Sequence, residues 1–294
     1  MTPSGVPRVA LATSRHALPG ATGPGANPDV DAPLLLDALE RSGIEGSLEV
    51  WNDVDVAWES FDAVVVRSTW DYTSQRERFL EWASERRRLF NHVSALEYSS
   101  DKHYLSDLAS RGVPVVTTRM VEVGEDPEFF DGRVVVKPAV GAGSADAAQY
   151  GDTDEERRRA REHVIRLHQR GAAAVIQPYV DSVDEVGERA LVFIDGEFSH
   201  ALTKGAMLTV PEERRDAAYR RARMSGALAD DEALETARRV LEVVPDTLYA
   251  RVDLVRVRTE WRVMELELVE PNLFLSYSPD AAARFARALD LRLS

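Results

Sequence analysis

The chain lacks cysteine altogether, since none occurs among its 294 residues. Disulfide bonds, a thiolate nucleophile and cysteine-ligated zinc or iron–sulfur centres are therefore excluded. It also lacks any apolar run near the ~20 residues that a bilayer crossing needs. The apolar run near the N-terminus covers only residues 9–12, too short for the core of a signal peptide. We therefore expect a cytoplasmic protein without a membrane partner.

Positive charge is also scarce. The chain has 36 Lys and Arg against 50 Asp and Glu, a formal net charge of −14, and no long basic stripe. Proteins that follow nucleic-acid phosphates need such a stripe, so we expect no nucleic-acid partner. Hydrophobic residues make up 44% of the chain, enough for a core. At ~100–200 residues per domain the length predicts two or three compact units, in a monomer or a homodimer.

The first unit, residues 1–98, alternates strand and helix patterns and predicts a small doubly wound α/β domain. Residues 8–12 and 63–67 predict buried parallel strands, and Asp31 with Pro33 predicts the start of a helix between them. Ligands of such domains meet the carboxyl ends of the strands. The residues that follow the second strand are therefore predicted to contact the substrate, namely Arg67, Ser68, Thr69, Trp70, Asp71 and Tyr72.

This loop offers the groups that bind a small zwitterion. Arg67 suits a carboxylate or ureido oxygen, and Asp71 suits an ammonium group. Holding both ends of one short substrate would make a ring closure effectively unimolecular. Trp70 and Tyr72 are explained equally well as buried aromatics at the end of a strand.

The second unit, residues 99–180, predicts a compact α+β module of the size of a lid domain. A capping box at residues 153–156 predicts the start of its longest helix. The other predicted elements are a helix at 101–111 and strands at 113–117, 133–137 and 173–176.

The third unit, residues 181–294, predicts a mostly antiparallel sheet. Two hairpins are predicted, at residues 190–204 and 249–270, with the second hairpin's last strand running to Glu270. The turn Asp195-Gly196 in the first hairpin is the strongest short-range turn signal in the chain.

Two features of this unit are less regular. Residues 205–230 are polar and without a clear period, which predicts a mobile insertion. His200 lies in the first hairpin, where a hydrogen-bonded structural histidine is commoner than a catalytic base.

A lysine and a glycine-rich loop follow one predicted strand of the second unit. Lys137 ends that strand, and glycines after a strand let backbone N–H groups close on an anion. Taken alone, this pattern also fits a turn with a surface lysine. Lys102 lies in the first turn of a helix, where the helix dipole disfavours a cation, and this conflict hints at a function. The loop residues predicted to bind nucleotide are Gly141, Gly143 and Ser144.

An extended segment and nearby carboxylates suit a nucleoside. The segment consists of Gln177, Pro178, Tyr179 and Val180, and its backbone can pair with an adenine edge. Glu185 or Glu188 can accept the ribose hydroxyls, as acidic residues do in dinucleotide folds. A surface loop with solvated carboxylates explains the same residues equally well.

The second hairpin carries the strongest signal for a metal. Arg251 and Asp253 alternate with apolar residues and share one face. On the partner strand, Glu270 and Asn272 are expected on the face of Met264, Leu266 and Leu268, while Glu265 and Glu267 are expected to point the other way. Asp253, Glu270 and Asn272 together would suit Mg²⁺ with nucleotide phosphates. A cross-strand ion pair is the alternative, and it would not require Asn272.

Taken in order, these features resemble the ATP-grasp superfamily over nearly the whole chain. The resemblance implies a three-part α/β (α+β) fold with a doubly wound N-terminal domain, a small lid and a C-terminal antiparallel-sheet domain. It implies that Lys102 and Lys137 hold ATP phosphates, that Asp253, Glu270 and Asn272 hold Mg²⁺, and that Arg251 stabilises the phosphoryl transfer, with Lys204 beside it.

A closer resemblance is to the group of D-cycloserine-forming O-ureido-serine cyclo-ligases. It rests on residues 65–72, on Lys137-Pro138-Ala139-Val140, and on the segments 249–253 and 265–268. It implies a ligase that activates a small amino-acid-like substrate with ATP and closes it into D-cycloserine. An intermolecular amide ligase and a noncatalytic nucleotide-binding module are the alternatives. No kinase catalytic-loop signature is present.

Overall fold

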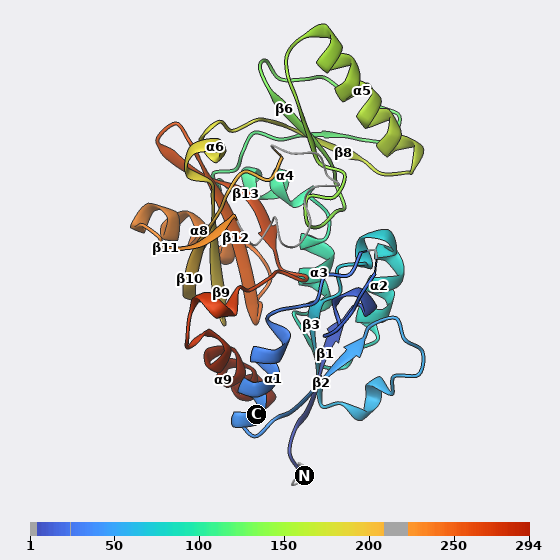
Figure 1. The fold of residues 1–294 in the computed structure, drawn as a ribbon, viewed down its shortest axis with the longest axis vertical. Helices are drawn as coiled ribbons and strands as arrows, with labels where there is room; N and C mark the ends of the chain where they lie inside the picture. Colours follow the sequence, from blue (N-terminus) through green and yellow to red (C-terminus); the bar gives the residue numbers. More distant parts are fainter. Residues whose placement is uncertain (1–4, 24, 209–222) are drawn as a thin grey trace.

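The computed structural model describes residues 5–23, 25–208 and 223–294, which form three sheets with helices packed against them. Figure 1 shows the module with α5, β6 and β8 at the top, the sheet with β9 to β13 at the left and the sheet with β1 to β3 at the lower right. The three-part α/β architecture predicted from the sequence is confirmed. Each sheet lies within one of the three predicted units, whose boundaries remain a prediction.

The N-terminal sheet is entirely parallel, with the strand order β2-β1-β3-β4. Every residue of β3 is buried, as its β-branched run predicts. The strands are β1 (Arg8–Thr13), β2 (Glu45–Val50), β3 (Ala63–Ser68) and β4 (Leu89–Phe90). The helices are α1 (Ala32–Arg41), α2 (Arg76–Ser84) and α3 (Val93–Ser99), with short 3-10 turns η1 (Arg15–Ala17), η2 (Trp58–Ser60) and η3 (Tyr72–Ser74).

The lid sheet is antiparallel and has the order β5-β8-β6-β7. Its helix α5 (Asp154–Gln169) begins as the capping box predicts, because the Thr153 side chain accepts a hydrogen bond from the Glu156 N–H. The strands are β5 (Arg119–Val121), β6 (Val134–Pro138), β7 (Ala148–Tyr150) and β8 (Ala174–Pro178).

The segment between the N-terminal domain and the lid differs from the prediction. The predicted strand at 113–117 forms only a single bridge, between Val115 and Val263. Helix α4 (Tyr104–Ser110) packs on the core of the five-stranded sheet rather than on the lid. The segment is joined to β13 by two backbone hydrogen bonds, from Val116 N–H to the Val263 oxygen at 2.9 Å and from Val263 N–H to the Pro114 oxygen at 2.8 Å.

The C-terminal sheet has the order β11-β10-β9-β12-β13 and is antiparallel throughout. The predicted turn at Asp195 and Gly196 is confirmed, since both residues adopt the left-handed conformation that this turn needs. The strands are β9 (Glu188–Ile194), β10 (Glu197–Lys204), β11 (Met224–Ala227), β12 (Tyr249–Val257) and β13 (Glu260–Glu267). The remaining helices are α6 (Ser182–Val186), α8 (Asp231–Val243), η5 (Leu275–Tyr277) and α9 (Ala281–Leu293).

The insertion predicted at 205–230 is wrong in part. Residues 224–227 form the edge strand β11, which pairs with β10 from Ala201 to Lys204. The stretch 209–222 lies outside the described residues. Polar edge strands such as β11 carry little hydrophobic alternation, so the sequence pattern does not reveal them.

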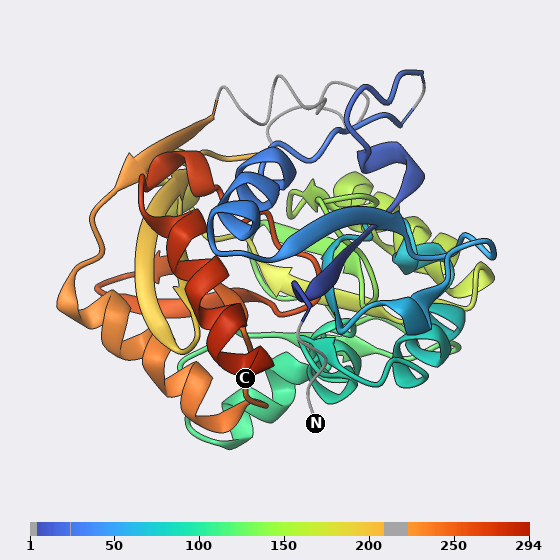
Figure 2. The same cartoon turned by 90° about the horizontal axis from the view of Figure 1, so that it is seen from below.

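The C-terminal helix joins the first and last units. Helix α9 lies beside α1, as both views show (Figure 1, Figure 2). Buried Leu39 of α1 and Phe285 of α9 belong to one apolar cluster that also includes Val192 and Tyr249 of the C-terminal sheet. This shared core fixes the end of β3 against the C-terminal sheet. Among the described residues, no helix has the length and apolar character that a bilayer crossing needs.

Candidate active site

A cavity of about 300 Å³ lies between the lid sheet and the C-terminal sheet. Its size falls at the lower end of ligand pockets. Most residues predicted to bind nucleotide, metal or the transferred phosphoryl group line it. They are Lys102, Lys137, Gly141, Gly143, Ser144, Gln177, Pro178, Tyr179, Val180, Glu188, Lys204, Arg251, Glu270 and Asn272. Of the two glutamates predicted for ribose, Glu188 lines the cavity and Glu185 does not.

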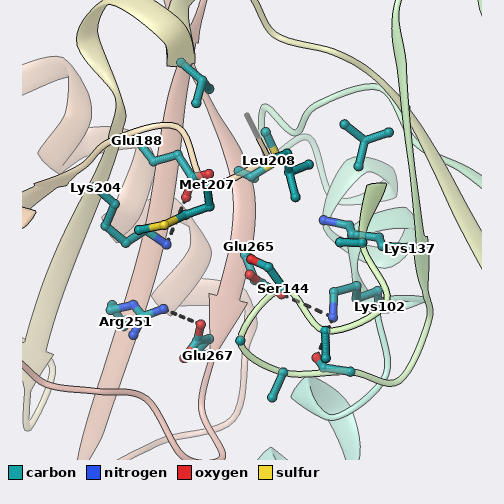
Figure 3. A pocket seen from close by; sticks show the side chains of 18 of the residues that line it. Lys102, Lys137, Ser144, Glu188, Lys204, Met207, Leu208, Arg251, Glu265 and Glu267 are labelled. Atoms are coloured by element: carbon teal, nitrogen blue, oxygen red, sulfur yellow. Dashed lines mark hydrogen bonds and ion pairs between the residues drawn. The ribbon is translucent and has the colours of Figure 1, made fainter. Parts of the chain in front are cut away.

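Two lysines enter the cavity from the lid side (Figure 3). Lys102 Nζ donates a hydrogen bond to the carbonyl oxygen of Gly141 at 2.9 Å and lies 3.2 Å from Glu265 Oε1. Lys137, on β6, has no carboxylate oxygen within 4.0 Å of its Nζ among the described residues. Burial lowers the pKa of Lys137, although Glu265 opposes this effect. A polyphosphate would supply the partner that the Lys137 ammonium lacks.

On the opposite wall, Arg251 and Lys204 both bind Asp253. Arg251 holds the carboxylate with two nitrogens, at 2.9 and 3.0 Å, and Lys204 Nζ lies 2.6 Å from Asp253 Oδ2. Lys204 also pairs with Glu188 Oε2 at 2.9 Å. Asp253 is fully buried, which alone would raise its pKa, but Arg251 and Lys204 outweigh burial and hold the pKa at about 2. Asp253 is therefore a permanent anchor for two cations that face the cavity.

Glu265 and Glu267 point away from Leu266 and Leu268, as predicted, but they line the same cavity as Glu270 and Asn272. The predicted separation of the two pairs is therefore wrong. In the observed register Asp253 lies opposite Glu265, and Arg251 lies opposite Glu267. Arg251 forms an ion pair with Glu267, and both glutamates line the cavity between the two groups of cations (Figure 3). Side-chain alternation cannot be extended to Glu270, because β13 ends at Glu267. Glu265 and Glu267 are the functional candidates that sequence reasoning missed.

The carboxylates of this wall carry unequal charge. Burial raises the pKa of Glu265, yet Lys102 and Lys137 outweigh it, so the pKa lies below its usual value. Burial raises the pKa of Glu267 to about 7, and burial with the nearby Glu267 raises the pKa of Glu270 well above its usual range. Carboxyl groups with a raised pKa keep their protons in the free protein. They lose these protons when they bind a cation.

The donor set fits Mg²⁺. One oxygen from each of Asp253, Glu265 and Glu267 lies within 4.8 Å of the others, and Glu270 and Asn272 line the same cavity. These are hard oxygen ligands, which Mg²⁺ prefers, and Mg²⁺ with nucleotide needs only one or two protein carboxylates. Asp253 is held by two cations and does not line the cavity, whereas Glu265, Glu267 and Glu270 do.

The loop after β3 lies mostly beneath the cavity. Of its six residues only Trp70 lines the cavity. Arg67, Ser68, Thr69 and Tyr72 are buried. Arg67 Nη2 donates a hydrogen bond to the Pro271 carbonyl oxygen at 3.0 Å, and the guanidinium lies 5.2 Å from the centre of the Tyr249 ring. Tyr72 packs in the apolar core of the parallel sheet.

Asp71 is also committed within the protein. Its Oδ1 accepts a hydrogen bond from Trp51 Nε1 at 2.8 Å. Asn27, from the loop that precedes α1, joins Trp70 as a cavity-lining residue of the N-terminal domain. Substrate contact by the loop therefore remains a prediction, with Trp70 as the member that the cavity reaches.

Comparisons with known proteins agree with this geometry. Residues 9–91 match the family described as the N-terminal domain of D-cycloserine synthetase DcsG. The chain is 39% identical over 288 residues to the cycloserine biosynthesis protein DcsG of Streptomyces lavendulae, covering 90% of this chain and 94% of that protein.

Two solved structures are similar along nearly the whole chain. The crystal structure of D-cycloserine synthetase DcsG has a TM-score of 0.85 at 34% identity and covers 98% of this chain and 100% of that chain. The D-alanine–D-alanine ligase from Bacillus anthracis complexed with ATP has a TM-score of 0.65 at 16% identity, covering 97% and 95% of the two chains. The second likeness concerns the fold alone.

Proposed function

Because the chain belongs to the D-cycloserine synthetase family and is an ATP-dependent ligase of the ATP-grasp fold, we propose that it closes O-ureido-D-serine, or an amino acid like it, into D-cycloserine. The single observation that carries this proposal is the cavity that three lysines, an arginine and four glutamates line together. Such a set suits the transfer of a phosphoryl group to a carboxylate, which depends on positioning and charge neutralisation.

In this proposal the nucleotide lies between the lid and the C-terminal sheet. Lys102 and Lys137 bind the phosphates together with the loop residues Gly141, Gly143 and Ser144. Adenine lies along residues 177–180, and Glu188 accepts the ribose hydroxyls. Lys137 is the lysine with the most to gain, because its half-buried ammonium has no carboxylate partner among the described residues.

Glu265, Glu267, Glu270 and Asn272 would hold Mg²⁺, with Asp253 behind them. When bound, the metal supplies positive charge to the phosphate oxygens. Arg251 and Lys204 lie on the same wall and neutralise the charge that develops on the transferred group. Asp253 orients both cations through three hydrogen bonds.

The substrate carboxylate accepts the terminal phosphoryl group, and the ureido nitrogen bonded to the side-chain oxygen then attacks the carboxyl carbon and displaces phosphate. The carbamoyl group on that nitrogen is removed by water as carbon dioxide and ammonia. A site that holds both ends of one molecule gains effective concentration over a site that must collect two. Trp70 and Asn27 are the N-terminal residues that reach the cavity, so we place the substrate beside them.

ADP release across a panel of candidate substrates tests the proposal. We expect O-ureido-D-serine alone to stimulate ADP release, while D-serine and D-alanine do not. If ADP release instead requires a second amine or amino acid, the cyclo-ligase assignment fails and an intermolecular amide ligase takes its place.

A further inference from the structure

Residues 270–275 form a short irregular segment that directs three side chains into the cavity. Glu270, Asn272 and Phe274 all line the cavity, although β13 ends before the segment at Glu267. Phe274 adopts a left-handed backbone conformation, with φ of 52°, which is uncommon for a bulky residue. Something other than a strand ladder must therefore fix this backbone.

Side chains from elsewhere in the chain bind its carbonyl groups one by one. Trp70 Nε1 donates to the Glu270 oxygen, Arg67 Nη2 to the Pro271 oxygen, and Arg251 Nη1 to the Asn272 oxygen, each at 3.0 Å. His200 Nε2 lies 2.9 Å from the Leu273 oxygen. Because a carbonyl only accepts, His200 must carry its proton on Nε2, which makes it a structural histidine.

One carboxylate binds the amide groups. Asp31 Oδ2 accepts from the N–H of Leu273 at 2.8 Å and of Phe274 at 2.9 Å, and Asp31 Oδ1 accepts from the N–H of Leu275 at 2.8 Å. Successive N–H groups around a left-handed residue form a concave anion site of the kind that often holds phosphate. In this protein the anion is the side chain of Asp31, which is fully buried.

Asp31 was expected only to begin helix α1. It precedes α1, but its side chain makes no capping hydrogen bond to that helix. Asp31, Arg67 and Trp70 all belong to the N-terminal domain, whereas the segment that they hold carries Glu270 and Asn272 into the cavity. These hydrogen bonds therefore connect the N-terminal domain to the proposed metal ligands. The substrate is placed beside the same domain.

We propose that Asp31 is a positioning residue that, with Arg67 and Trp70, holds residues 270–275 in the shape that directs Glu270 and Asn272 at the metal. This inference rests on the metal role given to those two residues in the proposed function. Asp31 touches neither nucleotide nor metal and acts through the backbone that it binds.

The test is a direct binding measurement. Mn²⁺ is titrated into the protein in the presence of a nonhydrolysable ATP analogue, and free Mn²⁺ is followed by electron paramagnetic resonance. Asp31→Asn offers one accepting oxygen and places an NH₂ group against an N–H donor. We expect Mn²⁺ affinity to fall by about 10–100-fold, as it does when partners of metal ligands are removed. Affinity for the analogue without metal should change by less than about threefold.

The matched control is Asp29→Asn. Asp29 is buried two residues away and accepts a hydrogen bond only from the Asp31 N–H among the described residues, which an amide oxygen can still accept. We expect its Mn²⁺ affinity to stay within about threefold of wild type. Trp70→Phe removes one hydrogen-bond donor and keeps an aromatic ring, so it should lower Mn²⁺ affinity less than Asp31→Asn does. It replaces Asp31→Asn in the test if Asp31→Asn does not fold.

Three results would overturn the inference. One is wild-type Mn²⁺ affinity in both Asp31→Asn and Trp70→Phe, together with weakened Mn²⁺ affinity in Glu270→Gln. Glu270 would then bind the metal without needing the hydrogen bonds that hold its backbone segment. Another is a loss of affinity for the metal-free ATP analogue in Asp31→Asn that is as large as the loss of Mn²⁺ affinity, because this would indicate general damage to the site. The last is an unchanged Mn²⁺ affinity in Glu270→Gln, which removes the metal assignment of the proposed function as well.

Discussion

The wall of the cavity and the loop after β3 contain similar residues but use them in different ways. In the wall, Lys102, Lys137 and Glu265 face the cavity and are only partly satisfied by one another. In the loop, Arg67 and Asp71 form hydrogen bonds to Pro271 and Trp51. Charged groups that face a cavity without full pairing are available for a ligand, whereas those paired inside the protein fix its shape. Residue type alone does not separate the two uses.

Asp253→Asn should have the largest effect, because it removes the anion shared by Arg251 and Lys204. We expect turnover to fall by about 10²–10³-fold. Stability should fall by about 3–5 kcal/mol, since Arg251 and Lys204 lose the buried carboxylate that they share. ADP release and urea denaturation measure the two effects. The exposed Asp290→Asn is the control, and wild-type values for Asp253→Asn would show that Asp253 does not anchor these cations.

Glu267→Gln and Glu265→Gln test the carboxylates found through the strand register. Each removes one negative oxygen from the proposed metal site, so the Mg²⁺ concentration for half-maximal rate should rise about 10–100-fold. Exposed Glu260→Gln on the same strand β13 is the control. If neither variant changes the Mg²⁺ concentration for half-maximal rate while Glu270→Gln raises it, Glu265 and Glu267 are not metal ligands. The ligands predicted from the sequence are then the right ones.

Lys137→Met and Lys102→Met compare a lysine that has no carboxylate partner within the described part of the chain with one that pairs with Glu265. Both should weaken ATP binding by about 10–100-fold, because each removes a charged hydrogen bond of about 1.5–3 kcal/mol. Their thermal stabilities should differ. Burial lowers the pKa of Lys137, so its charged form destabilises the free protein and Lys137→Met should not lower the melting temperature.

Lys102→Met should lower the melting temperature, because Lys102 binds Glu265 and the Gly141 carbonyl. Calorimetric titration with a nonhydrolysable ATP analogue and thermal denaturation check both variants. Unchanged affinity in both would place the phosphates elsewhere in the molecule.

Asp71→Asn should have the smallest effect. Its oxygen accepts from Trp51 Nε1, and an amide oxygen can do the same, so KM for the substrate should change less than about threefold. A rise in KM of about 100-fold would instead support the ammonium-binding role predicted from the sequence. It would also remove the distinction drawn between the loop and the cavity wall.

The fold was predicted well, and most residues that the sequence assigned to nucleotide line one cavity. Hydrophobic patterns and turn residues act locally, so the parallel strands, the 190–204 hairpin and the cap at Thr153 followed from them. Lys137 and the residues 177–180 line one cavity because strand ends bring such groups to one edge. Glu265 and Glu267 were missed because the alternation of side chains was extended beyond the end of β13 at Glu267 to Glu270 and Asn272.

The role of Asp31 could not be predicted from the sequence either. A helix-initiating aspartate before α1 has an ordinary local explanation, and its partners at 273–275 lie more than two hundred residues away. Only the packing of α9 against α1 brings the two segments together. Long-range hydrogen bonds between a side chain and an irregular backbone leave no periodic trace in a sequence.

The most direct test of the proposed function is the mass of the product formed from one substrate. The protein is incubated with ATP, Mg²⁺ and O-ureido-D-serine as the sole amino acid, and the products are separated and weighed by mass spectrometry. Intramolecular closure predicts ADP together with a cyclic product lighter than the substrate, identical to authentic D-cycloserine. A product heavier than the substrate, formed by joining two molecules, would contradict the account.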